Sequence, residues 1–269
     1  MTIQPPAWLL FVILPMLVSC NKQQPDQFQP QKITTATCAT YLQAPVLKGN
    51  TTTAIASEKY IWPNNSNGPI VIRVKFLQGG SNYLHTKVQR YAKEWQIHAN
   101  VKFDFVSKQS PAEVRISFDQ EADTYVWAIG TYLLDLTNDA IYNMHYANLK
   151  DSSSDEEIAG TVLHEFGHVL GLMHEQYHPQ VRWNKPYIYG YYKRKKGWSK
   201  HEVDAQLFGF QIADPIHSTY DPQSIMHDWY PKNFILAGNL PVATNSLSLR
   251  DKEFIQQLYP FPKKRNQPL

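Results

Sequence analysis

Residues 164–175 contain side chains that can hold a metal ion and activate water. His164 and His168 are four positions apart, so on a helix both imidazoles would lie on one face, about a turn apart. Two neutral imidazole nitrogens in that arrangement can bind a single Zn²⁺. Glu165 would lie beside the metal, where its carboxylate can take a proton from an activated water.

The position of His174 predicts that this helix ends shortly after His168. A continuing helix would carry His174 about 15 Å along the axis from His164, too far to share a metal ion. Gly171 can end the helix, because glycine enters the left-handed conformation at little cost. Three histidines then leave one zinc position open, as in a catalytic rather than a closed structural site.

Two simpler explanations of this stretch are weaker. A helix with histidines by chance would not be expected to match all five positions of the pattern H-E-x-x-H-x-x-G-x-x-H. A zinc fold that has lost its activity would not need Glu165, which is present.

The pattern resembles the metzincin signature of zinc proteases. Glu175, directly after the third histidine, makes it similar to the astacin branch, and the likeness to secreted bacterial relatives of astacin extends over residues 59–262, including Trp62 and residues 127–131. The resemblance implies an α+β metzincin (zincin) catalytic domain. It would have a twisted, mostly parallel five-stranded sheet with two long helices above a zinc cleft, and a smaller, mostly helical C-terminal subdomain. In that family the glutamate ties the mature N-terminus into the fold; for Glu175 a salt bridge to a nearby Arg or Lys is the simpler expectation.

Residues 221–228 resemble the Met-turn of astacins. There the methionine forms an apolar floor beneath the three histidines, which implies this role for Met226; ordinary core packing is the plain alternative. Astacins have a tyrosine, which can bind zinc or the transition-state oxyanion, where this chain has Asp228. Three alternatives stay open: Tyr230 acts as fifth ligand or oxyanion donor, the oxyanion is stabilised elsewhere, or Asp228 is a fourth zinc ligand that lowers activity.

Hydrophobic periodicity predicts the elements around this site. Expected strands cover residues 70–76, 101–106, 113–118, 125–134 and 140–146. Expected helices begin at Ser81 or Asn82, near Asp155, at Tyr187, after Ser199 and after Ser248. By resemblance, an extended substrate would add to an edge strand within residues 125–134.

Composition favours one globular domain of about 200 residues with extra segments. The chain has 269 residues, 43% of them hydrophobic, and a net charge of +3. This charge is too small to favour a nucleic-acid partner, and the basic run at residues 193–196 is expected to be the solvated face of a helix.

The N-terminal residues have the composition of a targeting segment followed by a tether. Residues 1–19 contain an apolar run of signal-peptide length and end in Leu-Val-Ser before Cys20. This resembles a bacterial lipobox and implies that Cys20 is lipidated; an ordinary cleaved secretory signal is the alternative. Residues 20–58 are rich in Gln, Pro and Thr and would form a flexible tether, with Cys38 as a free cysteine in it.

Residues 59–262 would then be the catalytic domain and residues 263–269 a basic tail. We expect an exported protein: a cell-envelope lipoprotein facing outward or the periplasm, and otherwise a secreted one. Its membrane contact would be the lipid anchor only, and it would be a monomer.

The combined prediction is a zinc-dependent endopeptidase with one catalytic Zn²⁺ and protein or peptide substrates. A catalytically weak or inactive zinc-loaded surface protein that binds peptides or matrix is the first alternative, supported by Asp228. A lipoprotein with a purely structural zinc is the second.

Overall fold

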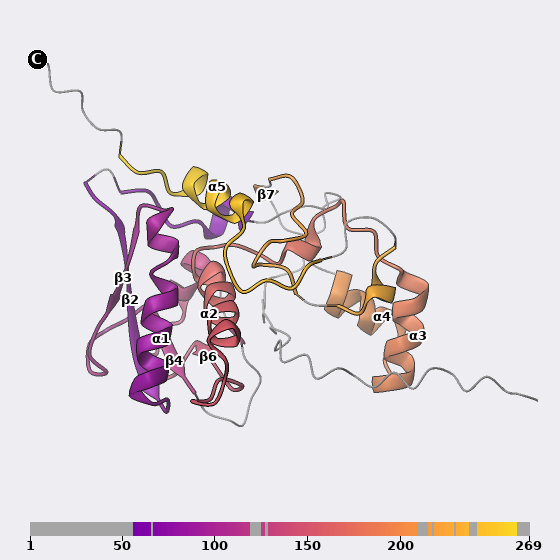
Figure 1. Ribbon diagram of the computed structural model, residues 1–269, viewed down its shortest axis with the longest axis horizontal. Helices are drawn as coiled ribbons and strands as arrows, with labels where there is room; N and C mark the ends of the chain where they lie inside the picture. Colours follow the sequence, from indigo (N-terminus) through magenta and orange to yellow (C-terminus); the bar gives the residue numbers. More distant parts are fainter. Residues whose placement is uncertain are drawn as a thin grey trace, which may run out of the picture. The chain divides into compact units, whose positions relative to one another are not determined.

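A five-stranded sheet forms the framework of the N-terminal half (Figure 1). The computed structural model describes residues 56–65, 67–118, 125–126, 129–208, 215–216, 218–228, 230–236 and 241–262. The strand order is β3-β2-β4-β6-β5, with the first four strands parallel and β5 antiparallel at the edge. The strands are β2 (Ile70–Gln78), β3 (Val101–Phe105), β4 (Val114–Ser117), β5 (Tyr125–Val126) and β6 (Met144–His145).

The alternation of side chains in β2 explains how the sheet is covered. Ile70, Ile72 and Val74 are buried, whereas Val71 and Arg73 are exposed, because successive residues of a strand point to opposite faces. β4 is buried along its whole length, as expected for the central part of a parallel sheet.

Two helices pack together beside this sheet (Figure 1). Helix α1 (Asn82–Ala92) is capped by Ser81 and buries the predicted apolar stripe. Helix α2 (Asp155–Val169) begins after Ser154, whose side chain accepts from the Glu157 amide. The Phe103 ring of β3 meets Phe166 of α2 edge-to-face, with centroids 4.8 Å apart. The hydrophobic periodicity of this half therefore predicted β2, β3 and β4 and the two helices correctly.

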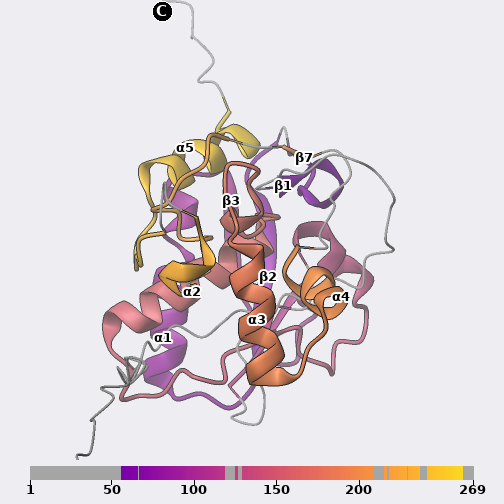
Figure 2. The same ribbon diagram turned by 90° about the vertical axis from the view of Figure 1, so that its right-hand side faces the viewer.

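The C-terminal half contains three further helices and a second, separate core. Its helices are α3 (Lys185–Lys196), α4 (Lys200–Val203), which continues as the π-helical turn η5 (Asp204–Phe208), and α5 (Leu249–Leu258). Both predicted capping boxes, at the starts of α4 and α5, are present. α5 joins the main core, whereas α3 and α4 pack around a smaller one, and Figure 2 shows α3 and α4 apart from α5.

Short 3-10 turns connect these elements. They are η1 (Glu58–Tyr60), η2 (Trp95–Ile97), η3 (Gly130–Asp135), η4 (Glu175–Tyr177) and η6 (Lys232–Phe234).

Two of the predicted strands are much shorter than expected. Of the described residues between 125 and 134, Tyr125–Val126 pair in the sheet, whereas Gly130–Asp135 form η3. Of residues 140–146, only Met144–His145 pair. Before β6, the Arg115 side chain donates to the Ile141 carbonyl, and the Asn143 amide donates to the Arg115 carbonyl of β4.

The described fold starts before the predicted domain boundary. Strand β1 (Ala56–Ser57) is buried and pairs antiparallel with β7 (Pro215–Ile216). Residues 1–55 and 263–269 lie outside the described residues, and with them the predicted signal peptide, Cys20, Cys38 and the basic tail. Within the described part of the chain, none of the helices has the length and apolar character needed to cross a membrane.

Candidate metal centre

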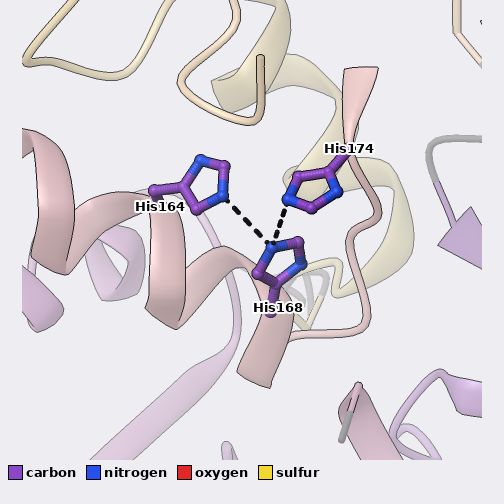
Figure 3. Close-up of side chains that lie close together, drawn as sticks. All are labelled: His164, His168 and His174. Carbon is purple, nitrogen blue, oxygen red and sulfur yellow. Dashed lines mark hydrogen bonds between the residues drawn. The ribbon is translucent and has the colours of Figure 1, made fainter. Parts of the chain in front are cut away.

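Three histidine side chains converge in the interior of the fold (Figure 3). The Nε2 atom of His168 lies 3.2 Å from that of His164 and 3.1 Å from that of His174. All three residues are buried. Among the residues that the structure describes, they are the one group of three whose ligand atoms are close enough to share a metal ion.

The end of α2 brings the third histidine back to the other two. His164 and His168 lie one turn apart on α2. Gly171 has φ = 87°, in the left-handed region, and the amide of Leu172 donates to the Gly167 carbonyl over 3.0 Å. The chain thereby reverses direction and delivers His174 to the same point, as the spacing predicts.

Hydrogen bonds on the far side of two rings set their tautomers. His164 Nδ1 donates to the Ile225 carbonyl and His168 Nδ1 to the Leu172 carbonyl, each over 2.8 Å. Since a carbonyl only accepts, each Nε2 presents a lone pair to the centre. Burial, followed by the neighbouring imidazoles, holds the pKa of His168 and His174 well below the ordinary value. Neutral imidazoles with converging lone pairs are the donor set that Zn²⁺ requires, so these residues fit the predicted metal.

The Met-turn packs directly beneath α2. Met226 is fully buried, and a Cβ added to Gly167 would lie 2.2 Å from its Sδ atom. Only glycine at position 167 therefore lets the methionine approach the helix this closely. The amide of Glu175 donates to the Met226 carbonyl over 2.9 Å, which joins the turn to the segment after His174.

Glu165 lies at the wall of a cavity next to the histidines. The side chain is 1% exposed. The cavity has a volume of about 80 Å³ and is also lined by His164, His227 and Asp228. The carboxylates of Glu165 and Asp228, together with that of Glu157, therefore line one space beside the metal position that is large enough for water.

Asp228 occupies the position of the family's tyrosine. Its Oδ2 atom is 3.5 Å from His174 Nε2, and its Oδ1 atom is 4.0 Å from His164 Nε2. It does not belong to the group of mutually close ligand atoms. Gln176 holds it at two points: Gln176 Nε2 donates to Asp228 Oδ2 over 2.9 Å, and the Asp228 amide donates to Gln176 Oε1 over 3.0 Å. Sequence reasoning missed Gln176, because an amide side chain gives no signal of metal binding or proton transfer.

Tyr230 packs against the second core and is joined to the metal centre through Gln176. Its ring contacts Trp183 and Phe234 of the second core, and its hydroxyl is 3.3 Å from Gln176 Nε2. Burial, and then the charge of Asp228, raises its pKa well above the ordinary value. The role of Tyr230 as oxyanion donor or fifth ligand stays a prediction.

The expected salt bridge of Glu175 is wrong. No ion pair of this residue is present among the described residues. Glu175 Oε1 accepts from the Asp221 amide over 2.7 Å, and Oε2 is buried without a hydrogen-bond partner in the described part of the chain. Burial, opposed by the amide and assisted by nearby carboxylates, raises the pKa of Glu175 to about 8.

Comparison with known proteins agrees with this geometry. Two structures of myroilysin are similar to the chain. The first has 36% sequence identity and a TM-score of 0.65, and the match covers 77% of this chain and 98% of myroilysin. The second has 35% identity and a TM-score of 0.54, and the match covers 80% of this chain and 95% of myroilysin. A hatching-enzyme zinc protease from the medaka fish Oryzias latipes matches at 18% identity with a TM-score of 0.48, covering 78% and 98%. Searches of family models and of curated proteins found no match. The predicted α+β metzincin fold is confirmed, and the chain belongs to the astacin family, as a zinc metalloendopeptidase with one catalytic Zn²⁺ at a three-histidine site.

Proposed function

We propose that His164, His168 and His174 hold the zinc ion and that Glu165 moves the protons of peptide hydrolysis, with Met226 as the floor of the site. The observation that carries this assignment is the convergence of the three Nε2 atoms beside a cavity lined by Glu165. Two of the imidazoles have Nδ1 engaged by a backbone carbonyl, so they present Nε2 to a metal without further rearrangement.

Each residue then has a distinct task. Zinc, when bound, polarises the scissile carbonyl and lowers the pKa of water at the site. The Glu165 carboxylate takes a proton from the attacking water and returns it to the leaving amine nitrogen, so that the carboxylate is regenerated. Substrate would lie extended beside β5, which is the edge strand of the sheet and therefore has an open side for backbone hydrogen bonds.

Export and anchoring complete the proposal. A signal peptide over residues 1–19 and lipidation of Cys20 would place the enzyme in the cell envelope, with residues 20–58 as the tether and the protein as a monomer. The support is the residue pattern alone, since these positions lie outside the described residues.

Cleavage of casein or gelatin by the purified protein, with and without a chelator, tests this function. Glu165→Ala should retain zinc and lower kcat by about 10²–10⁴-fold. Glu156→Ala, an exposed carboxylate in the first turn of the same helix, is the matched control and should leave kcat unchanged. Undiminished cleavage by Glu165→Ala would remove Glu165 as the base. A folded, zinc-loaded wild type that cleaves nothing would favour the peptide-binding alternative.

A further inference from the structure

Asp228 cannot do the chemistry of the tyrosine that it replaces. A tyrosine hydroxyl can donate a hydrogen bond to an oxyanion, whereas an ionised carboxylate only accepts. A negative charge facing the oxyanion would also destabilise it. An ionised Asp228 can instead accept a hydrogen bond from the attacking water, which has protons to donate.

The position of Asp228 agrees with that role. Its two oxygens are 3.5 Å from His174 Nε2 and 4.0 Å from His164 Nε2, and its carboxylate is not among the ligand atoms that lie mutually close enough to share one ion. It lines the same small cavity as Glu165. A water in that cavity would have the carboxylates of both Glu165 and Asp228 among its neighbours.

Asp228 is also held in place by two hydrogen bonds to a single buried side chain. Gln176 binds its carboxylate and its backbone amide together, at 2.9 and 3.0 Å, and Gln176 itself is fully buried. The two hydrogen bonds restrict the carboxylate to one orientation, because both its backbone and its terminal oxygen are fixed. Preorganisation of this kind is what a group that orients a reacting molecule requires.

The negative charge of Asp228 should also affect the affinity of the site for Zn²⁺. Neutral histidines leave the two charges of Zn²⁺ uncompensated in a buried site, and a buried ion is costly unless it is paired. Asp228 and Glu165, both buried and both beside the histidines, supply two negative charges. Removing the charge of Asp228 should weaken the binding of the metal.

We propose that Asp228 is a second catalytic carboxylate of this centre, which accepts a hydrogen bond from the attacking water and balances the metal charge, and that Gln176 is its positioning residue. This rests on the proposed function of the three histidines and Glu165. It also answers the alternatives left open by the sequence: Asp228 acts beside the zinc ligands and is not one of them.

Asp228→Asn and Gln176→Leu in the full-length protein separate charge from orientation. The zinc dissociation constant is measured by competition with a chromophoric chelator, and kcat and KM on a peptide substrate. Asp228→Asn should raise the zinc dissociation constant by about 10–100-fold, the range found for residues that support metal ligands, and lower kcat. Gln176→Leu keeps the charge, so it should lower kcat by about tenfold with a smaller change in zinc affinity and little change in KM.

Asp204→Asn is the matched control. This half-buried carboxylate accepts from the Tyr189 hydroxyl over 2.6 Å in the second core, and its loss should leave zinc affinity and kcat unchanged. Equal zinc affinity and kcat in Asp228→Asn and wild type would overturn the proposal. So would a cobalt-substituted spectrum in which Asp228→Asn changes the coordination number, because Asp228 would then be a direct ligand.

Other outcomes of these experiments also test the role of Asp228. If Asp228→Asn does not fold, Gln176→Leu decides, and an unchanged kcat overturns the proposal. If Tyr230→Phe abolishes kcat while Asp228→Asn does not, the tyrosine has the role and Asp228 does not. Failure of the wild type to cleave would refute the proposed function, whereas the zinc dissociation constants would still test Asp228.

Discussion

Gly167→Ala tests whether the close approach of the Met-turn to α2 supports the metal site. A Cβ at this position would lie 2.2 Å from Met226 Sδ and 3.3 Å from Trp95 Cζ2. Both neighbours are fully buried, so neither can move into solvent. The added methyl must displace Met226 or separate the turn from the helix.

The net effect combines two opposing terms. Alanine is favoured over glycine in a helix interior by about 1 kcal/mol, whereas overpacking a close-packed core costs about 1–3 kcal/mol. We therefore expect Gly167→Ala to lower the free energy of unfolding by about 0–2 kcal/mol. Gly190→Ala in α3 is the matched control: its Cβ would meet only the exposed end of Arg194, at 3.1 Å. It should stabilise by up to about 1 kcal/mol.

A double-mutant cycle identifies the cause. Met226→Ala alone should cost about 2–5 kcal/mol through the cavity that it leaves. Combined with Gly167→Ala, the loss should be smaller than the sum by about 1–3 kcal/mol, because the truncated side chain makes room for the methyl. Thermal unfolding of the metal-free proteins measures these differences, at about 2–4 °C per kcal/mol for a domain of this size. Additive effects would refute the reasoning, since they would mean that the two side chains do not meet.

Two further predictions concern metal and pH. Chelation of zinc should lower the melting temperature by about 10 °C, because zinc at a thousandfold excess over its dissociation constant contributes about 4 kcal/mol to stability. The chelated protein should still unfold in one cooperative transition, because the main core forms without the metal. Circular dichroism melts with and without chelator measure this, and a non-cooperative chelated state would support a structural zinc. Burial opposes ionisation of Glu113, but its hydrogen bonds with Arg73 outweigh burial and lower its pKa below 4.5; the pair therefore stabilises the fold above about pH 4.5, and this contribution is lost as the pH falls through the lowered pKa. Urea unfolding from pH 7 to pH 3 should show a shallower decline for Glu113→Gln than for wild type, and parallel curves would contradict the assignment.

The metal ligands could be predicted because their geometry is local. The spacing of His164 and His168 and the turn at Gly171 depend on helix geometry and on the left-handed conformation of glycine. Both features are set within a few residues. The helix starts near Asp155, after Ser199 and after Ser248 could be predicted for the same reason, because capping is decided within four residues.

The length of β5, in contrast, depends on residues far away in the sequence. Residues 125–134 have the composition of a strand, but Gly130 adopts φ = 51°, and a Cβ there would lie 1.8 Å from the Tyr60 carbonyl oxygen. The segment leaves the sheet to pack on residues 70 positions earlier in the chain. Strand propensity depends on such tertiary contacts, which the composition of a segment does not reveal.

The surroundings of the metal were the least predictable part. Gln176 and Asp228 are 52 positions apart and are joined only through the fold. Glu175 was expected to meet a basic side chain, but its Oε1 atom accepts from the Asp221 amide, and its Oε2 atom is buried without a hydrogen-bond partner among the described residues. Which polar groups face each other in a core is decided by packing between distant segments.

The far end of α2 depends on residues from both ends of the described fold. The carbonyl of Val169 is bound by the Trp62 indole and that of Leu170 by the Tyr259 hydroxyl, at 2.8 and 2.7 Å, and this hydroxyl also accepts from the Trp62 amide. A ribosome must therefore synthesise residue 259 before the zinc helix has its full set of hydrogen bonds. Because Gly171 and His174 follow directly, a chain that ends before residue 259 lacks a hydrogen bond next to the segment that delivers the third histidine.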